Sequence, residues 1–145
     1  MDKGLAVLIM AVVGGLIALQ APINAGLGKA TGSFAAALVS FAVGTVILAS
    51  IVVVSGKAGG VAEATGVEWY YLLGGLLGAA YVFSALVLVD EIGAGGVAAA
   101  TVTGQLATSV ALDRLGVLGL EQTSLTWDRL LGVGLLLAGT YLIVR

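Results

Sequence analysis

The chain has 145 residues, of which 60% are hydrophobic and only 10% charged, and its net charge is −2. Soluble domains have roughly 25% charged residues, so this composition, with a mean hydropathy of +1.17, predicts an all-α integral membrane protein. The sequence contains no Cys and no His, so we predict no metal and no other cofactor. It has no basic run, so we predict no nucleic-acid partner.

Apolar runs predict a single membrane domain over residues 1–145 with five transmembrane helices. Each run is long enough to cross a hydrocarbon core about 30 Å thick. The first run lacks a small-residue cleavage site, so we retain it as a span and not as a signal peptide. Ser33 follows Gly32 and is predicted to cap the second helix. We place the spans at residues 4–28, 33–54, 69–89, 95–113 and 127–144.

The first span carries Gln20, Pro22 and Asn24 in its second half. Pro22 has no N–H and frees the carbonyl of Ala18, so we expect a helix break there. Gln20 and Asn24 lie four residues apart and share one helix face beside this break. An amide in hydrocarbon without a partner costs roughly 2 to 7 kcal/mol. The two amides are therefore predicted either to bind a polar substrate or to join helices.

The fourth span lies in the most polar segment, GGVAAATVTGQLATSVALDRLG from Gly95 to Gly116. A polar stripe at every fourth position is formed by Thr101, Gln105, Ser109 and Asp113. Because a helix this polar is unsuited to lipid, we expect other helices to enclose it. Gln105, Thr101 and Ser109 are predicted to contact substrate. In the alternative interpretation, Gln105 only bridges helices.

Two further sets of residues have predicted roles. No acid lies in the middle of a span, so a proton-coupling group would have to be Asp113, Asp90 or Glu91. Asp113 is preferred because it continues the polar stripe, although Arg114 beside it offers a simple surface pair. Glycines spaced for close helix packing are Gly74 and Gly78 in the third span, and Gly96 and Gly104 in the fourth.

Three stretches together resemble one known family. They are QAPINAGLG from Gln20, GSFAAALVSFAVGT from Gly32, and GQLATSVALDRLGVLGL from Gly104. They resemble the YdcZ family of the drug/metabolite transporter (DMT) superfamily, small multi-pass proteins of the bacterial inner membrane described as exporters. The resemblance continues through WYYLLGGLLGAAYV from Trp69 and RLLGVGLLLAG from Arg129. It implies a DMT-like five-span unit that pairs antiparallel with a second copy, as a dual-topology homodimer or with a fused or paired partner.

Three functions are compatible with these patterns. The first is a secondary transporter that moves a small polar or weakly charged solute by alternating access at a midplane site of a dimer. The second is a passive dual-topology channel, and the third is a structural or assembly subunit in which the amides join helices. The expected partners are membrane lipid, a second copy and a small-molecule substrate. An enzyme is not expected, because no nucleophile is paired with a base.

Overall fold

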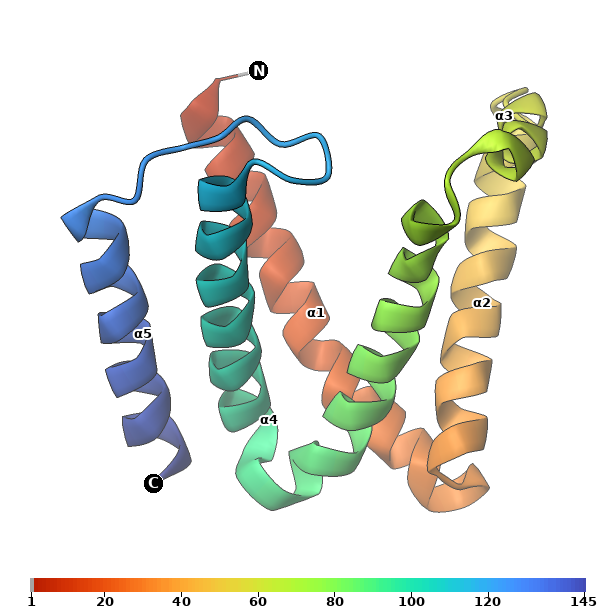
Figure 1. Ribbon diagram of the computed structural model, residues 1–145. Coiled ribbons are helices and arrows are strands. Elements are labelled where there is room, and N and C mark those ends of the chain that lie inside the picture. Colours follow the sequence, from red (N-terminus) through yellow and green to blue (C-terminus); the bar gives the residue numbers. More distant parts are fainter. Residues whose placement is uncertain (1) are drawn as a thin grey trace. The chain divides into compact units, whose positions relative to one another are not determined.

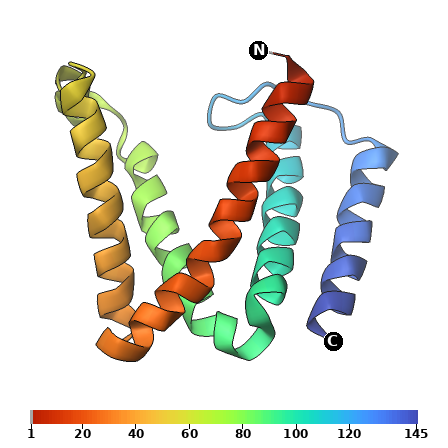
Figure 2. The same ribbon diagram turned by 180° about the vertical axis from the view of Figure 1, so that it is seen from behind.

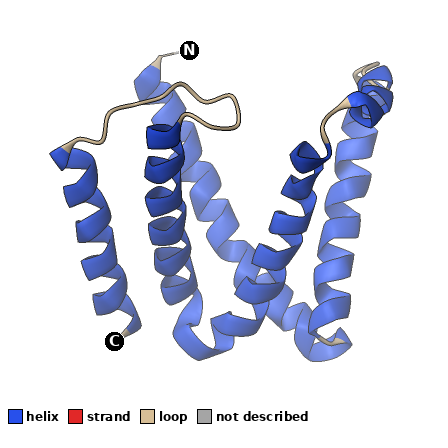
Figure 3. Cartoon of the chain, in the orientation of Figure 1, coloured by secondary structure: helices blue, strands red, loops and turns tan. Residues whose placement is uncertain are grey.

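The computed structural model describes residues 2–145, which form helices joined by loops and contain no strand (Figure 3). The helices are α1 (Lys3–Thr31), α2 (Ser33–Val54), α3 (Gly59–Glu63), α4 (Leu73–Leu115) and α5 (Trp127–Val144), with short 3-10 helices η1 (Ala64–Gly66) and η2 (Trp69–Leu72). Within residues 2–145, four helical segments are long and apolar enough to cross a membrane: Lys3–Thr31, Ser33–Val54, Trp69–Leu115 and Trp127–Val144. The predicted all-α membrane class is therefore confirmed.

The chain divides into two compact units, and each is described by itself. Unit 1 comprises the residues through Ala18 together with Leu88–Arg145. Unit 2 is Leu19–Val87. Helices α1 and α4 each contribute to both units, so Gln20 and Asn24 belong to unit 2, whereas the polar stripe of α4 belongs to unit 1.

Unit 2 is held together by small residues and stacked aromatic rings. Phe34 of α2 stacks on Phe83 of α4, with ring centroids 4.5 Å apart and planes 17° from parallel. A Cβ added at Gly28 would lie 3.6 Å from Leu86, so α1 lies close against α4 at that point. The side chains that are almost fully removed from solvent here include Ala36, Val82, Ala85 and Leu86.

The junction between α1 and α2 is made by Gly32 alone. Its φ of 85° and ψ of 151° are accessible to glycine and unfavourable for other residues. Helix α1 ends at Thr31 and α2 begins at Ser33, so Ser33 is the first helical residue and the prediction that it caps α2 is wrong. The reversal of the chain uses the backbone of Gly32, and no side chain caps the helix.

Gly93 interrupts α4 in a similar way. The helix is assigned continuously from Leu73 to Leu115, but Gly93 has a φ of 71° and a ψ of 164°, which is not helical. Residues before and after Gly93 are helical, so the change of direction is confined to one residue. The predicted turn through residues 92–95 is thus shorter than expected.

In unit 1, α5 and the part of α4 that follows Gly93 run side by side in opposite directions (Figure 1). Thr103 of α4 and Thr140 of α5 join them, with their hydroxyl oxygens 2.7 Å apart. Each hydroxyl also has a carbonyl acceptor on the opposite helix: Ala99 at 3.1 Å for Thr140 and Leu136 at 3.3 Å for Thr103. Thr103 is only 5% exposed, and this short chain of hydrogen bonds is the polar part of the α4–α5 contact.

Candidate functional site

A cleft between α1 and α2 in unit 2 places Gln20 beside two hydroxyl groups. Its volume is about 210 Å³, and its lining residues are Gln20, Ser40, Phe41, Gly44, Thr45 and Leu48. None of the three polar side chains, Gln20, Ser40 and Thr45, forms a hydrogen bond with another group in residues 2–145. The cleft therefore presents an amide, two hydroxyls and an aromatic ring with unused hydrogen-bonding capacity. We call it the Gln20 cleft.

Asn24 is also in unit 2, but its surroundings differ from those of Gln20. Together with Ala21 and Ala25 it is buried on one face of α1, and its exposure is only 5%. Gly28, one turn further along that face, lies beside Leu86 of α4. Asn24 does not line the Gln20 cleft, and its amide forms no hydrogen bond with a group in residues 2–145. The two amides of α1 thus have separate surroundings. Helix α1 itself continues from Lys3 to Thr31 with Pro22 inside it.

Thr101, Gln105 and Ser109 of the polar stripe lie away from the face of α4 that contacts α5, whereas Asp113 is paired with Arg129 of α5. Thr103 contacts α5, and Thr101 and Gln105 are each two residues from Thr103, about 200° around the helix. Gln105 and Ser109 are exposed and Thr101 is half-buried. The Gln105 amide forms no hydrogen bond within the part of the chain that the structure describes. It therefore joins no pair of helices there.

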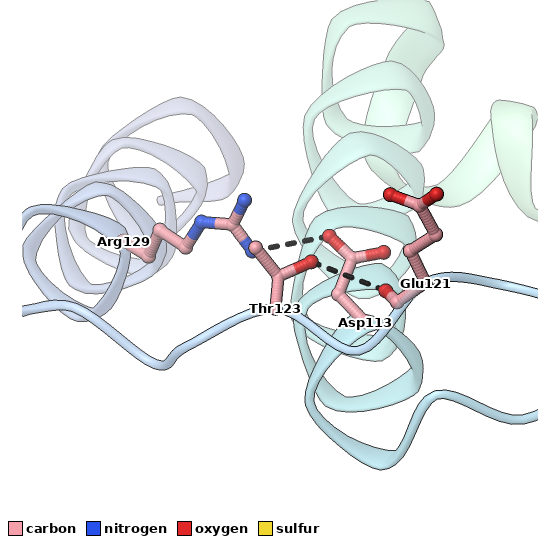
Figure 4. A network of polar contacts seen from close by, with 4 residues as sticks. All are labelled: Asp113, Glu121, Thr123 and Arg129. Carbon is pink, nitrogen blue, oxygen red and sulfur yellow. Dashed lines mark hydrogen bonds and ion pairs between the residues drawn. The ribbon is translucent and has the colours of Figure 1, made fainter.

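Asp113 forms an ion pair, and its partner is Arg129. The Nη1 atom of Arg129 donates to Oδ2 of Asp113 at 3.1 Å, and both side chains are 36% exposed. The alternative of a surface pair with Arg114 is not formed, because consecutive residues point about 100° apart around a helix. Arg129 lies in the first turn of α5, so the pair joins the end of α4 to the beginning of α5 (Figure 4).

The segment 116–126, which connects these helices, folds back on the end of α4 (Figure 2). The backbone N–H of Thr123 donates to the Asp113 carbonyl at 2.8 Å, and the Gln122 amide donates to the Arg114 carbonyl at 3.0 Å. The Thr123 hydroxyl donates to the Glu121 carbonyl at 3.3 Å (Figure 4). Carbonyls that the helix end leaves without intrahelical partners are thereby bonded.

We expect this ion pair to contribute about 0.5 to 1 kcal/mol, because both partners are partly exposed. Asp113→Asn and Arg129→Gln should each lower the unfolding temperature in detergent, and the double variant should lose less than the sum of the two. Proton-coupled flux of Asp113→Asn is the second measurement. Lost coupling at an unchanged amount of folded protein would give Asp113 the coupling role, whereas full coupling would leave it a purely structural partner of Arg129.

The remaining predicted positions have varied surroundings. Asp90 and Glu91 are exposed in the last turn before Gly93. A Cβ added at Gly78 would lie 3.5 Å from Phe41, and one at Gly96 would lie 3.3 Å from Val144. Gly74 and Gly104 have no described atom within 4 Å of that position, so their packing role stays a prediction. Residues 2–145 contain no group of three or more Asp or Glu side chains placed to hold a metal.

Four contributors were not identified as site residues from the sequence: Ser40, Thr45, Thr103 and Arg129. Ser40 belongs to the four-residue series Ala36, Ser40, Gly44, a spacing that is typical of helix packing. The sequence feature that could have indicated the cleft is the Ser40 hydroxyl, four positions before Gly44. Its interpretation depends on which helix lies opposite, and only the tertiary structure gives that.

These features define the class: a multi-pass helical membrane protein with hydrogen-bonding groups inside its apolar helices. A family model described as "Putative inner membrane exporter, YdcZ" matches residues 5–142. The chain belongs to this family, and the resemblance inferred from its motifs is confirmed. It is therefore a multi-pass protein of the inner membrane, in a family that is described as membrane exporters and not as enzymes. No curated protein and no solved structure matches the chain.

Proposed function

We propose that the protein exports a small polar or weakly charged solute, and that the Gln20 cleft forms part of the solute-binding site. The observation that carries the proposal is the unused hydrogen-bonding capacity of Gln20, Ser40 and Thr45 around one cleft. Polar groups inside apolar helices are costly to desolvate unless they have partners, and a transported solute supplies such partners. Amides and hydroxyls bind without fixed charge, which favours neutral or weakly charged solutes.

The proposal includes a second set of contacts and a transport cycle. Asn24, Thr101, Gln105 and Ser109 are proposed as further solute contacts. The exposed Gln105 amide without a hydrogen bond in residues 2–145 supports this role over a purely structural one. The solute site is proposed to open alternately to the two sides of the membrane, as in other secondary transporters.

Flux into liposomes tests the cleft. Purified protein is reconstituted and assayed against a panel of small cations, anions and neutral metabolites, with and without a pH gradient. For the solute found, Gln20→Ala and Ser40→Ala should each reduce flux roughly three- to tenfold, since a hydrogen bond contributes about 0.5 to 1.5 kcal/mol. The matched control is Ser50→Ala on the same helix, because the Ser50 hydroxyl is already bonded to the Val46 carbonyl at 2.8 Å.

Each outcome of this assay has a definite meaning. Saturable flux that falls in both cleft variants, and not in Ser50→Ala, supports the proposal. Flux that never saturates identifies a channel. Normal flux in Gln20→Ala and Ser40→Ala, after correction for folded protein, removes the cleft from the transport path.

We further propose five spans per chain and an antiparallel homodimer. With 43 residues, α4 would extend about 65 Å if it were straight, more than twice the hydrocarbon thickness, and Gly93 divides it. Five spans place Lys3, Lys57, Arg114 and Arg129 on one side of the membrane, against Lys29 and Arg145 on the other. This is a weak bias for fixing one orientation.

Dual orientation is testable because the chain has no native Cys. Lys57→Cys and Arg145→Cys should each be labelled from both sides of native membranes by an impermeant maleimide. Basic residues added at one terminus should fix a single orientation, in which the two cysteines are labelled from opposite sides. Labelling of both cysteines from the same side would contradict five spans, and a single native orientation without a partner chain would contradict the antiparallel homodimer.

A further inference from the structure

A second cleft, in unit 1, has a different chemistry from the Gln20 cleft. It lies between α4 and α5 and has a volume of about 570 Å³. Arg114 is its one polar lining residue, and all of its other lining residues are apolar. Apolar residues in its wall include Val110 of α4, Leu125 of the connecting segment, and Leu130, Val133 and Leu137 of α5.

The charge of Arg114 has no partner among residues 2–145. Its neighbour Asp113 is bound by Arg129 at 3.1 Å, and the Arg114 guanidinium forms no ion pair or hydrogen bond with any group in residues 2–145. Its backbone carbonyl accepts a hydrogen bond from the Gln122 amide. An apolar cleft with one uncompensated cation among its lining residues is complementary to a molecule with an apolar body and an anionic head.

The length and place of the cleft fit one leaflet of a membrane. Along α4 the lining extends from Ala107 to Leu115, a rise of about 12 Å, and half of a hydrocarbon core is about 15 Å. Trp127 begins α5 at the end of the cleft where Arg114 lies, because Arg129 in the first turn of α5 is paired with Asp113. Trp is enriched at the membrane–water interface. The cation therefore lies at headgroup level and the apolar walls at the level of acyl chains.

We propose that this cleft binds an anionic phospholipid, with one acyl chain between α4 and α5 and the phosphate paired with Arg114. Basic pockets between transmembrane helices are a known form of anionic-lipid site. The proposal does not depend on export, because it rests on the cleft of unit 1 and is measured by binding.

The test is native mass spectrometry of delipidated protein in detergent, titrated with phosphatidylglycerol and with phosphatidylcholine of the same acyl chains. Wild type should bind one phosphatidylglycerol about fivefold more tightly, the ratio that corresponds to roughly 1 kcal/mol per basic residue near anionic lipid. Arg114→Gln should abolish this preference, whereas Lys57→Gln, which removes a cation outside the cleft, should keep it.

Two glycines of α5 test the apolar part of the cleft. Gly134 lines it and Gly132 does not, and both have no described atom within 4 Å of an added Cβ. Gly134→Leu should therefore fill the cleft and lower phosphatidylglycerol binding at least fivefold, whereas Gly132→Leu should bind like wild type. Size-exclusion profiles and circular dichroism establish that both variants are folded.

Three results would overturn the proposal. The first is equal binding of the two lipids by wild type, and the second is equal binding by Gly134→Leu and Gly132→Leu. The third is full displacement of the lipid by millimolar glycerol phosphate, which would identify a site for a small phosphate in place of a lipid. Lost export in a variant with normal lipid binding would overturn only the proposed function.

Discussion

Gly93→Ala is expected to destabilise the protein by about 1 to 3 kcal/mol, whereas Gly75→Ala in the same helix should be neutral or stabilising. The φ of 71° and ψ of 164° at Gly93 lie in a region that is essentially restricted to glycine. Gly75 is helical and has no described atom within 4 Å of an added Cβ, and Ala is favoured over Gly in a helix by roughly 0.5 to 1 kcal/mol.

Thermal unfolding in detergent, followed by circular dichroism, measures both effects. Gly93→Ala should unfold at a lower temperature than wild type, and it should give less monodisperse protein on size exclusion. An unchanged unfolding temperature for Gly93→Ala would show that the chain can reverse here without a glycine. A large loss in Gly75→Ala would show that this helix position is packed against a partner outside the chain.

The sequence predicts the helices of this protein better than their junctions. Apolar runs identify α2 and α5 because long hydrophobic segments have few alternatives in a membrane. The two tight junctions depend on single residues, Gly32 and Gly93. The glycines and alanines around Gly93 indicate a turn, but several of the glycines could adopt a positive φ. Which of these glycines takes the positive φ cannot be read from the local sequence.

The polar residues show the same difference. Gln20 is recognisable as a site residue, since an amide within an apolar run is unusual. Ser40 looks like a packing residue until α2 is placed beside α1, because its spacing from Ala36 and Gly44 is that of a helix seam. The partner of Asp113 is Arg129, sixteen positions later, and not the adjacent Arg114. A sequence gives the spacing around one helix, but the distance between two helices requires the fold.

Gly44→Leu is expected to reduce solute flux about tenfold or more while the protein stays folded. Gly44 lines the Gln20 cleft, and no described atom lies within 4 Å of a Cβ added there. A leucine can therefore enter the space of about 210 Å³ without displacing the protein, and solute must then be accommodated against it. Placing solute and leucine in the same space is a form of overpacking, which costs typically 1 to 3 kcal/mol. A loss of 1.4 kcal/mol in the free energy of solute binding lowers the affinity tenfold.

The matched control for this variant is Gly14→Leu in α1, where an added Cβ also has no described atom within 4 Å and which does not line the cleft. Both variants are reconstituted at equal amounts of folded protein, judged by size exclusion and unfolding temperature, and flux is measured across a range of solute concentrations. Because the leucine occupies the space of the solute, Gly44→Leu should weaken solute binding and lower transport at every concentration, and Gly14→Leu should match wild type. Saturable flux of wild-type size in Gly44→Leu would show that the solute does not pass through the Gln20 cleft.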